Sequence, residues 1–251
     1  MDSLWFLLPS LALLAALYAS VGHGGASGYL ALLSLTTLGT GAPWLKSHAL
    51  CLNVLVAALA FFFFLREGHF QHRLTWPLVV TSIPMALLGG ALQLPEVLYD
   101  TLLSVTLLWA AWRLAKSARA NVETLKGPPP VPVALAAGGA IGLTAGMVGI
   151  GGGVFLSPLL VLLGWADAKT TAATSAVFIL VNSVAGLAGM AATHQFQVDG
   201  SLLGPFAIAV ALGGLAGARL GARKASETTV RRLLAAVLIV AAARRVIGMV
   251  V

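Results

Sequence analysis

Residues 142–160 read GLTAGMVGIGGGVFLSPLL, and this stretch decides the fold that we expect. It lies within a charge-free run from 127 to 166, which is long enough for the roughly 20 apolar residues of a membrane-spanning helix. Five glycines between 146 and 153 interrupt the stretch. Because glycine inside a helix costs about 1 kcal/mol relative to alanine, such a cluster predicts a break in a membrane helix rather than a continuous one.

A related glycine cluster lies near the N-terminus, where residues 21–30 read VGHGGASGYL. Further matches recur in the same order at a spacing of 127 to 131 positions: Asn53 with Asn182, Pro77 with Pro205 and Arg113 with Arg244. A nearly constant spacing indicates one duplicated unit. The sequence therefore predicts a single transmembrane domain over 1–251, with one repeat at about 1–115, a linker at 116–131 and a second repeat at about 132–251.

The composition places the chain in a membrane. Hydrophobic residues make up 59% of it and charged residues only 9%, whereas a soluble domain carries about 25% charged residues. Each repeat divides into five helical elements, expected near 4–20, 28–42, 46–65, 74–94 and 97–115 and near 132–148, 153–165, 169–193, 201–222 and 228–250. We expect an all-α integral membrane protein with glycine-broken helices and 8–10 transmembrane segments. The number stays open because the short second element of each repeat fits either a re-entrant segment or a full crossing.

Lysine and arginine residues predict the orientation of the chain. If the segment around Arg66 and Arg73 is cytoplasmic, 12 of the 15 basic residues fall inside, while Lys46, Arg244 and Arg245 fall outside. Membrane proteins carry such an excess on their cytoplasmic side. This assignment places the linker in the cytoplasm and both termini on the extracytoplasmic side of the plasma (inner) membrane. Corresponding helices of the two repeats then run in opposite directions, and many secondary transporters use such inverted repeats for alternating access.

The content of cysteine, histidine and charge argues against several classes of function. Cys51 is the single cysteine, and the five histidines show no metal-ligand spacing, so we expect neither a metal site nor a cofactor. The net charge of +7 could suggest nucleic acid, but the sequence has no soluble domain to bind it, and positive-inside topology accounts for the surplus. The expected partners are a small anionic substrate and the lipid bilayer, with a homodimer as an alternative to a monomer.

The two glycine clusters form the strongest candidate site. A helix broken inside the bilayer frees backbone N–H groups, which must then face protein or a wet cavity. The N-terminus of the following helix adds donors and the positive end of a dipole, which suits an anion. The candidate substrate-binding residues here are Gly22, His23, Gly24, Gly25, Ser27, Gly149, Gly151, Gly152 and Gly153. The alternative is close helix packing, which is the role that we expect for Gly213, Gly217 and Gly221.

Polar side chains on the long helices after each cluster form a second set of candidates. Hydroxyl and amide groups donate hydrogen bonds to an anion without the cost of a buried charge. The candidate ligands are Asn53, Thr174, Ser175 and Asn182, with Ser47 and Ser183 beside them. Their alternative role is to hold helices together. Because an asparagine occupies corresponding positions in both repeats, the two interpretations have equal weight for that pair.

His23 is the candidate for proton coupling, because it is the titratable residue that lies deepest in an apolar stretch. An ionisable residue inside a membrane is a functional candidate by default. His48 lies nearer a helix end. Arg113 and Arg244 correspond in the two repeats and are expected to anchor helix ends at the interface rather than to bind substrate.

One motif favours an enzyme instead. Residues 25–28 read GASG and match the GxSG pattern of rhomboid-type intramembrane serine proteases, which would make Ser27 a nucleophile. Such a serine needs a histidine base on another helix within hydrogen-bond reach. Apart from His23, the histidines lie at helix ends or in loops. We therefore favour a function without catalytic residues.

The motif over 142–160, followed by ATSA at 173–176, resembles the sulfite exporter TauE/SafE permeases, also called the 4-toluene sulfonate uptake permease (TSUP) family. Residues 22–30 and 49–53 resemble the first repeat of the same family. The resemblance implies a permease for a small sulfur-containing anion such as sulfite, thiosulfate or an organosulfonate. Together with the inverted repeat, we expect alternating access around a mid-membrane site at the two glycine breaks, with an anion channel as the alternative mechanism.

Overall fold

The computed structural model describes residues 2–36, 38, 41–117 and 125–223. Its helices are α1 (Asp2–Ala19), α2 (Ala26–Leu33), α3 (Ala42–Arg66), α4 (His72–Ala91), α5 (Glu96–Ser117), α6 (Val131–Val148), α7 (Gly153–Leu162), α8 (Ala168–Ala192) and α9 (Gly200–Arg223). Within the described ranges the regular structure is entirely helical, which confirms the all-α class. The element expected at 228–250 lies outside the described residues.

Five of these helices, α3, α4, α6, α8 and α9, are long and apolar enough to cross a membrane, and α1 contributes a shorter apolar helix over Trp5–Ala19. Large apolar side chains are exposed on the outside of the bundle, among them Trp76 on α4 and Leu212 on α9. Lipid tails are as apolar as these side chains, whereas exposing such side chains to water is unfavourable. The described part of the chain is therefore a multi-pass membrane protein, as its composition predicts.

The second element of each repeat is shorter than expected. The predicted helix over 28–42 is wrong in its length, since α2 ends at Leu33 and a new helix begins at Ala42. Gly41 (φ +88°) and Pro43 in the first turn of α3 explain why the next helix begins at Ala42, because they mark a helix start. At 1.5 Å per residue, α2 and α7 extend about 12 and 15 Å, so neither alone crosses a hydrocarbon core of about 30 Å.

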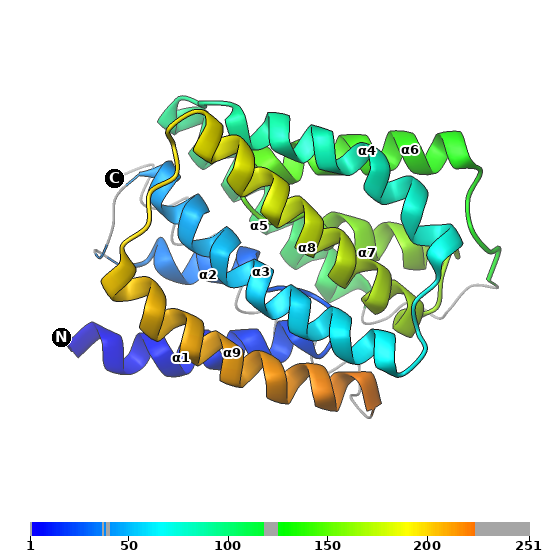
Figure 1. The fold of residues 1–251 in the computed structure, drawn as a ribbon, viewed down its shortest axis with the longest axis horizontal. Coiled ribbons are helices and arrows are strands. Elements are labelled where there is room, and N and C mark those ends of the chain that lie inside the picture. The colour runs from blue at the N-terminus through cyan, green and yellow to red at the C-terminus, as the bar shows by residue number, and fades with distance from the viewer. Residues whose placement is uncertain (1, 37, 39–40, 118–124, 224–251) are drawn as a thin grey trace.

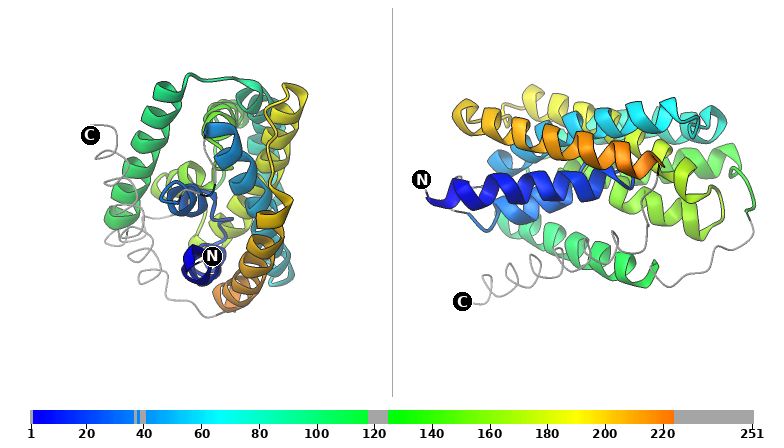
Figure 2. Two further views of the ribbon diagram at one scale, coloured as in Figure 1. Left: turned by 90° about the vertical axis from the view of Figure 1, so that its left-hand side faces the viewer. Right: turned by 90° about the horizontal axis from the view of Figure 1, so that it is seen from below.

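The long helices form two flanking pairs with a central pair between them. In Figures 1 and 2, α1 lies beside α9 on one flank and α4 beside α6 on the other, and α3 and α8 pack together in the middle. Exchanging the repeats maps α1 onto α6, α3 onto α8 and α4 onto α9. The contact between α1 and α9 then becomes the contact between α6 and α4, which the structure also contains. The opposite orientation of the repeats in a membrane stays a prediction.

Glycines spaced four residues apart bring the flanking helices together. A Cβ atom at Gly213, Gly217 or Gly221 of α9 would overlap the carbonyl oxygen of Ala12, Ala16 or Ser20 of α1. The packing role expected for these glycines is therefore confirmed. Gly138, Gly142 and Gly146 of α6 make the same contact with carbonyl groups of α4. Gly146 thus belongs to helix packing, and the second break begins only after it.

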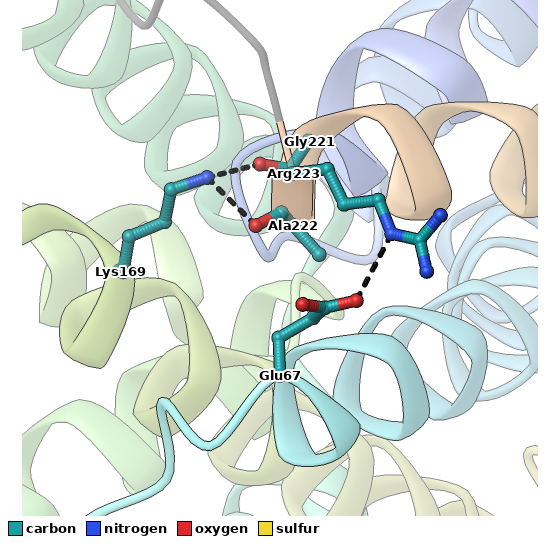
Figure 3. Close-up of polar contacts among 5 residues, drawn as sticks. All are labelled: Glu67, Lys169, Gly221, Ala222 and Arg223. Carbon is teal, nitrogen blue, oxygen red and sulfur yellow. Dashed lines mark hydrogen bonds and ion pairs between the residues drawn. The ribbon is translucent and has the colours of Figure 1, made fainter.

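The bundle has two ends, which we call the linker end and the Lys46 end. The linker end, on the right in Figure 1, holds the starts of α4, α6 and α8 and the last residues of α3 and α9. Two contacts fix α9 there (Figure 3): the ammonium group of Lys169 donates to the carbonyls of Gly221 and Ala222, and Arg223 Nε lies 3.0 Å from Glu67 Oε1.

The two contacts at the linker end differ in how much they are expected to contribute to stability. The side chains of Arg223 and Glu67 are 60% and 35% exposed, and ion pairs of that kind contribute at most about 1 kcal/mol. Lys169 is part-buried and binds the final carbonyls of a helix, where a cation is favoured and a charged hydrogen bond contributes about 1.5–3 kcal/mol. Lys169 is therefore expected to stabilise the end of α9 more than the ion pair does.

Candidate functional site

Both predicted helix breaks are present, and glycines make them. In the first break Gly22 and Gly25 have φ values of +75° and +101°; in the second Gly149, Gly151 and Gly152 have values of +85°, +72° and +87°. Left-handed backbone costs other residues about 1–2 kcal/mol each, whereas glycine adopts it freely. The chain can therefore leave α1 and α6 in mid-bundle and restart as α2 and α7.

After the first break, the short helix α2 lies against α1. The hydroxyl groups of Ser27 and Tyr18 are 2.9 Å apart, and a Cβ atom at Gly28 would come within 2.8 Å of the Tyr18 ring. The Tyr29 hydroxyl donates to the Gly24 carbonyl at 2.9 Å, so the break also receives a bond from within α2. The partner of Ser27 is thus a phenol, whereas a serine nucleophile needs a general base.

Asn53 of α3 joins the two breaks. Its Oδ1 accepts the amide of Ala26, the first residue of α2, at 3.0 Å. Its Nδ2 donates to the Ser183 hydroxyl of α8 at 2.8 Å. A Cβ atom at Gly24 would overlap Oδ1, and one at Gly151 would overlap Nδ2. The asparagine amide is therefore the common contact of both glycine clusters.

His23 begins a chain of side chains that crosses between the repeats. Its Nδ1 lies 3.1 Å from the Val21 carbonyl, and its Nε2 lies 3.1 Å from the hydroxyl of Ser157 on α7. Ser157 in turn shares a hydrogen bond of 2.7 Å with Ser175 on α8. Because a carbonyl only accepts, Nδ1 carries a proton, and Nε2 either accepts from Ser157 or, when protonated, donates to it.

A cleft lies between the breaks, and the starts of α2 and α7 face it. Its lining includes His23, Ser27, Asn53, Gly153 and Val154, and it is too narrow for a water molecule. Among the described residues none accepts a hydrogen bond from the amides of Ser27 and Gly28 in α2, or of Gly153 and Val154 in α7. Two helix N-termini with unbonded amides therefore meet at one place, and their dipoles favour an anion there.

The remaining candidate residues divide into structural contacts and one exception. Thr174 bonds to Thr75 of α4 at 3.2 Å, and Ser47 accepts the amide of Gln197, so both hold elements together. His48 donates to the Trp44 carbonyl and accepts the amide of Asp199, which likewise makes it a structural contact. Asn182 is the exception: both polar atoms of its amide are buried and have no hydrogen-bond partner among the described residues.

The structure does not place the two expected anchor residues, and three residues that contact the breaks were not among the candidates. The side chain of Arg113 and all of Arg244 lie outside the described residues. Tyr18 and Ser157 complete the polar contacts of the breaks, and only their place near the glycines could have pointed to them. Lys46 is 3% exposed, and its stem packs against Gly149. Its position as a lone charge between the apolar runs 3–45 and 47–65 is the sequence signal that points to it.

Comparisons with known proteins find a family model and a relative that the chain resembles. Residues 7–245 match the family model described as sulfite exporter TauE/SafE. The chain is 39% identical over 230 residues to the probable membrane transporter protein y4hK of Sinorhizobium fredii strain NGR234. These residues make up 90% of this chain and 92% of that protein. No solved structure matches the chain significantly.

Proposed function

The chain belongs to the sulfite exporter TauE/SafE family of membrane transporters, and from that premise we propose that it carries a small sulfur-containing anion by alternating access. The substrate would bind between the two glycine breaks. Sulfite, thiosulfate and small organosulfonates are the substrates to test first. The family is one of transporters, which agrees with a function that needs no catalytic residue.

The observation that carries the proposal is the pair of helix N-termini at the closed cleft. Amides of α2 and α7 would donate to the anion, and the hydroxyl and amide side chains beside them would add further donors. No lysine or arginine lines this cleft within the described part of the chain. Neutral donors suit a carrier, because a site that transports an anion must also release it.

Two pockets at opposite ends of the bundle fit the alternating access of a carrier. At the linker end a pocket of about 60 Å³ reaches Val21, the neighbour of Gly22. At the Lys46 end a pocket of about 270 Å³ is lined by Lys46, which packs on Gly149. The cleft between them admits no water. A conducting channel would need a continuous path, whereas a carrier opens its two sides in turn.

Anion flux into proteoliposomes tests the proposed function. We expect flux that saturates with substrate concentration, with sulfite, thiosulfate and small sulfonates competing and chloride competing weakly. Empty liposomes and protein carrying Gly152→Leu are the controls. Absence of flux for every sulfur anion would contradict the proposal. Non-saturating, voltage-driven conduction would support the channel alternative.

His23 is the candidate for coupling transport to protons. Its Nε2 faces the Ser157 hydroxyl, which can donate to the neutral ring or, by turning its own hydrogen toward Ser175, accept from the protonated ring. An unperturbed imidazole titrates at about pH 6.5, and a bound anion favours the protonated form. Proton and anion would then assist each other, so flux should rise as the external pH falls from about 7.5 to 5.5.

We expect His23→Gln to retain anion binding but to lose this dependence of flux on pH. Glutamine keeps a hydrogen-bonding side chain at the break without titrating. Initial flux rates across the pH range, with His48→Gln as the matched control at a structural histidine, measure the effect. A wild-type pH profile in His23→Gln would show that His23 has only a structural role at the break.

The orientation of the chain is also open to test. We expect the linker to be cytoplasmic, and residues near the Lys46 end, including the N-terminus, to be extracytoplasmic. Single cysteines placed at the exposed Lys126 and Leu125 of the linker, in a chain carrying Cys51→Ser, report the side by their reaction with an impermeant thiol reagent. Rapid labelling of these positions in intact cells would overturn the orientation.

A further inference from the structure

The pocket at the Lys46 end has features of an anion site of its own. It has a volume of about 270 Å³ and lies between the start of α3, the segment between α4 and α5, and the segment between α8 and α9. Lys46, Gln93, Tyr99, His194, Gln195 and Gln197 line it. Figure 1 shows these elements at the left-hand end of the bundle, opposite the contacts of Lys169.

Lys46 is buried in this pocket without a counter-charge. The residue is only 3% exposed. Within the described ranges, no residue accepts a hydrogen bond from its ammonium group or forms an ion pair with it. Among the described residues that line the pocket there is no aspartate or glutamate. Removing an ammonium group from water costs several kcal/mol unless a partner replaces the water. An anion that enters the pocket would supply that partner.

The neighbouring side chains leave Lys46 as the main charge in the pocket. Gln195 Nε2 donates to the Ala91 carbonyl and to the Thr193 hydroxyl, so its amide is held in place. His194 and Gln197 are exposed at the mouth. The acid of the same segment, Asp199, does not line the pocket, and its carboxylate accepts hydrogen bonds from Ser201, which lower its pKa and keep it charged.

The pocket also connects with the second glycine break. A Cβ atom at Gly149 would come within 2.9 Å of Lys46 Cγ, so the lysine stem lies directly against the residue that ends α6. The Tyr99 hydroxyl donates to the carbonyl of Val148, the last residue of that helix, at 3.3 Å. An anion bound at Lys46 would therefore stand at the entrance to the break.

We propose that Lys46 binds a small oxyanion in this pocket. The pocket would be an intermediate binding site between the solvent at the Lys46 end and the cleft at the glycine breaks. The onward movement of the anion from Lys46 to the cleft rests on the proposed function, but anion binding at Lys46 can be tested without transport. The pocket is wider than the cleft, so the anion would keep part of its water here and lose it on moving inward. A single lysine gives attraction without the tight hold of several charges, which agrees with a transient site.

Anion binding and flux in Lys46→Gln and Lys46→Arg test the proposal. We expect Lys46→Gln to raise the KM for sulfite at least tenfold and to abolish the thermal stabilisation of detergent-solubilised protein by sulfite or sulfate at constant ionic strength. Lys46→Arg should keep both. Lys126→Gln is the matched control, because it removes one positive charge from an exposed position in the linker. A wild-type KM and a wild-type thermal shift in Lys46→Gln would overturn the proposal.

A measurement on the unaltered protein covers the case in which Lys46→Gln fails to fold. A small amine-reactive reagent should modify Lys46 more slowly in the presence of sulfite, with Lys126 as the internal reference, as followed by mass spectrometry. Equal rates with and without sulfite would overturn the proposal. Protection of Lys46 in protein that shows no flux would support the site and contradict the transport proposal, so the two failures are distinguishable.

Discussion

Gly152→Leu is expected to abolish anion flux while the protein still inserts and remains monodisperse. Gly152 has a φ of +87°, and a Cβ atom there would lie 2.8 Å from Phe178 Cε1 and 3.1 Å from Ile141 Cγ2. The left-handed backbone costs leucine about 1–2 kcal/mol and overpacking costs about 1–3 kcal/mol. The two costs add to about 2–5 kcal/mol, which does not exceed the 5–15 kcal/mol stability typical of a folded protein, so we expect the fold to survive.

The effect on flux is expected to be much larger than the effect on stability. Gly152 directly precedes α7, whose first amides face the cleft. A shift of about 1 Å in groups that position a substrate can cost roughly a hundredfold in rate. Initial rates of sulfite uptake in proteoliposomes, with size-exclusion chromatography of the same preparations, measure the two effects separately.

Gly204→Leu is the matched control for this substitution. Gly204 lies in α9, is exposed, and has no atom within 4 Å of the position of an added Cβ. The same leucine there should leave flux unchanged. Full activity of Gly152→Leu would contradict a site at the second break. Aggregation of Gly152→Leu, with normal behaviour of Gly204→Leu, would favour the packing interpretation of the glycines.

The long helices could be predicted from the sequence because charged residues and caps mark their ends. The expected element 169–193 became α8 (Ala168–Ala192), which begins where the carboxylate of Asp167 accepts the amide of Thr170. The first two elements of the first repeat offered no such marks, since residues 3–45 contain no charge. Hydropathy alone does not separate α2 from the segment that follows it, and the expected helix over 28–42 was too long for that reason.

The glycine breaks could be predicted from the sequence, but their partners could not. Glycine clusters interrupt a helix through local backbone preference, which a sequence displays directly. The contact of His23 with Ser157, or of Asn53 with Ser183, joins residues more than a hundred positions apart and depends on how the repeats pack. Sequence repetition also makes Asn53 and Asn182 look equivalent, whereas the structure gives them different surroundings.

That difference between the two asparagines predicts opposite effects on stability. Asn53 makes hydrogen bonds with both ends of its amide, so Asn53→Leu leaves the Ala26 amide and the Ser183 hydroxyl without their partner. Hydrogen bonds between side chains in membrane proteins contribute about 0.6 kcal/mol on average and up to about 1.7 kcal/mol. We therefore expect a lower Tm for Asn53→Leu, together with reduced flux because the start of α2 is no longer held.

Asn182→Leu should instead raise the Tm and still abolish flux. A buried amide without partners is unfavourable by about 1–3 kcal/mol, and leucine of similar size removes that cost in the conformation described here. We propose that the Asn182 amide finds its partners in the bound anion, or in a conformation in which α8 has moved relative to the breaks. Removing it would stabilise this closed conformation and prevent the next step. Thermal unfolding in detergent and flux in proteoliposomes, measured on both variants, decide the matter. If Asn182→Leu transports at the wild-type rate, its amide has no part in transport; if it lowers the Tm as Asn53→Leu does, its amide is bonded in the folded protein.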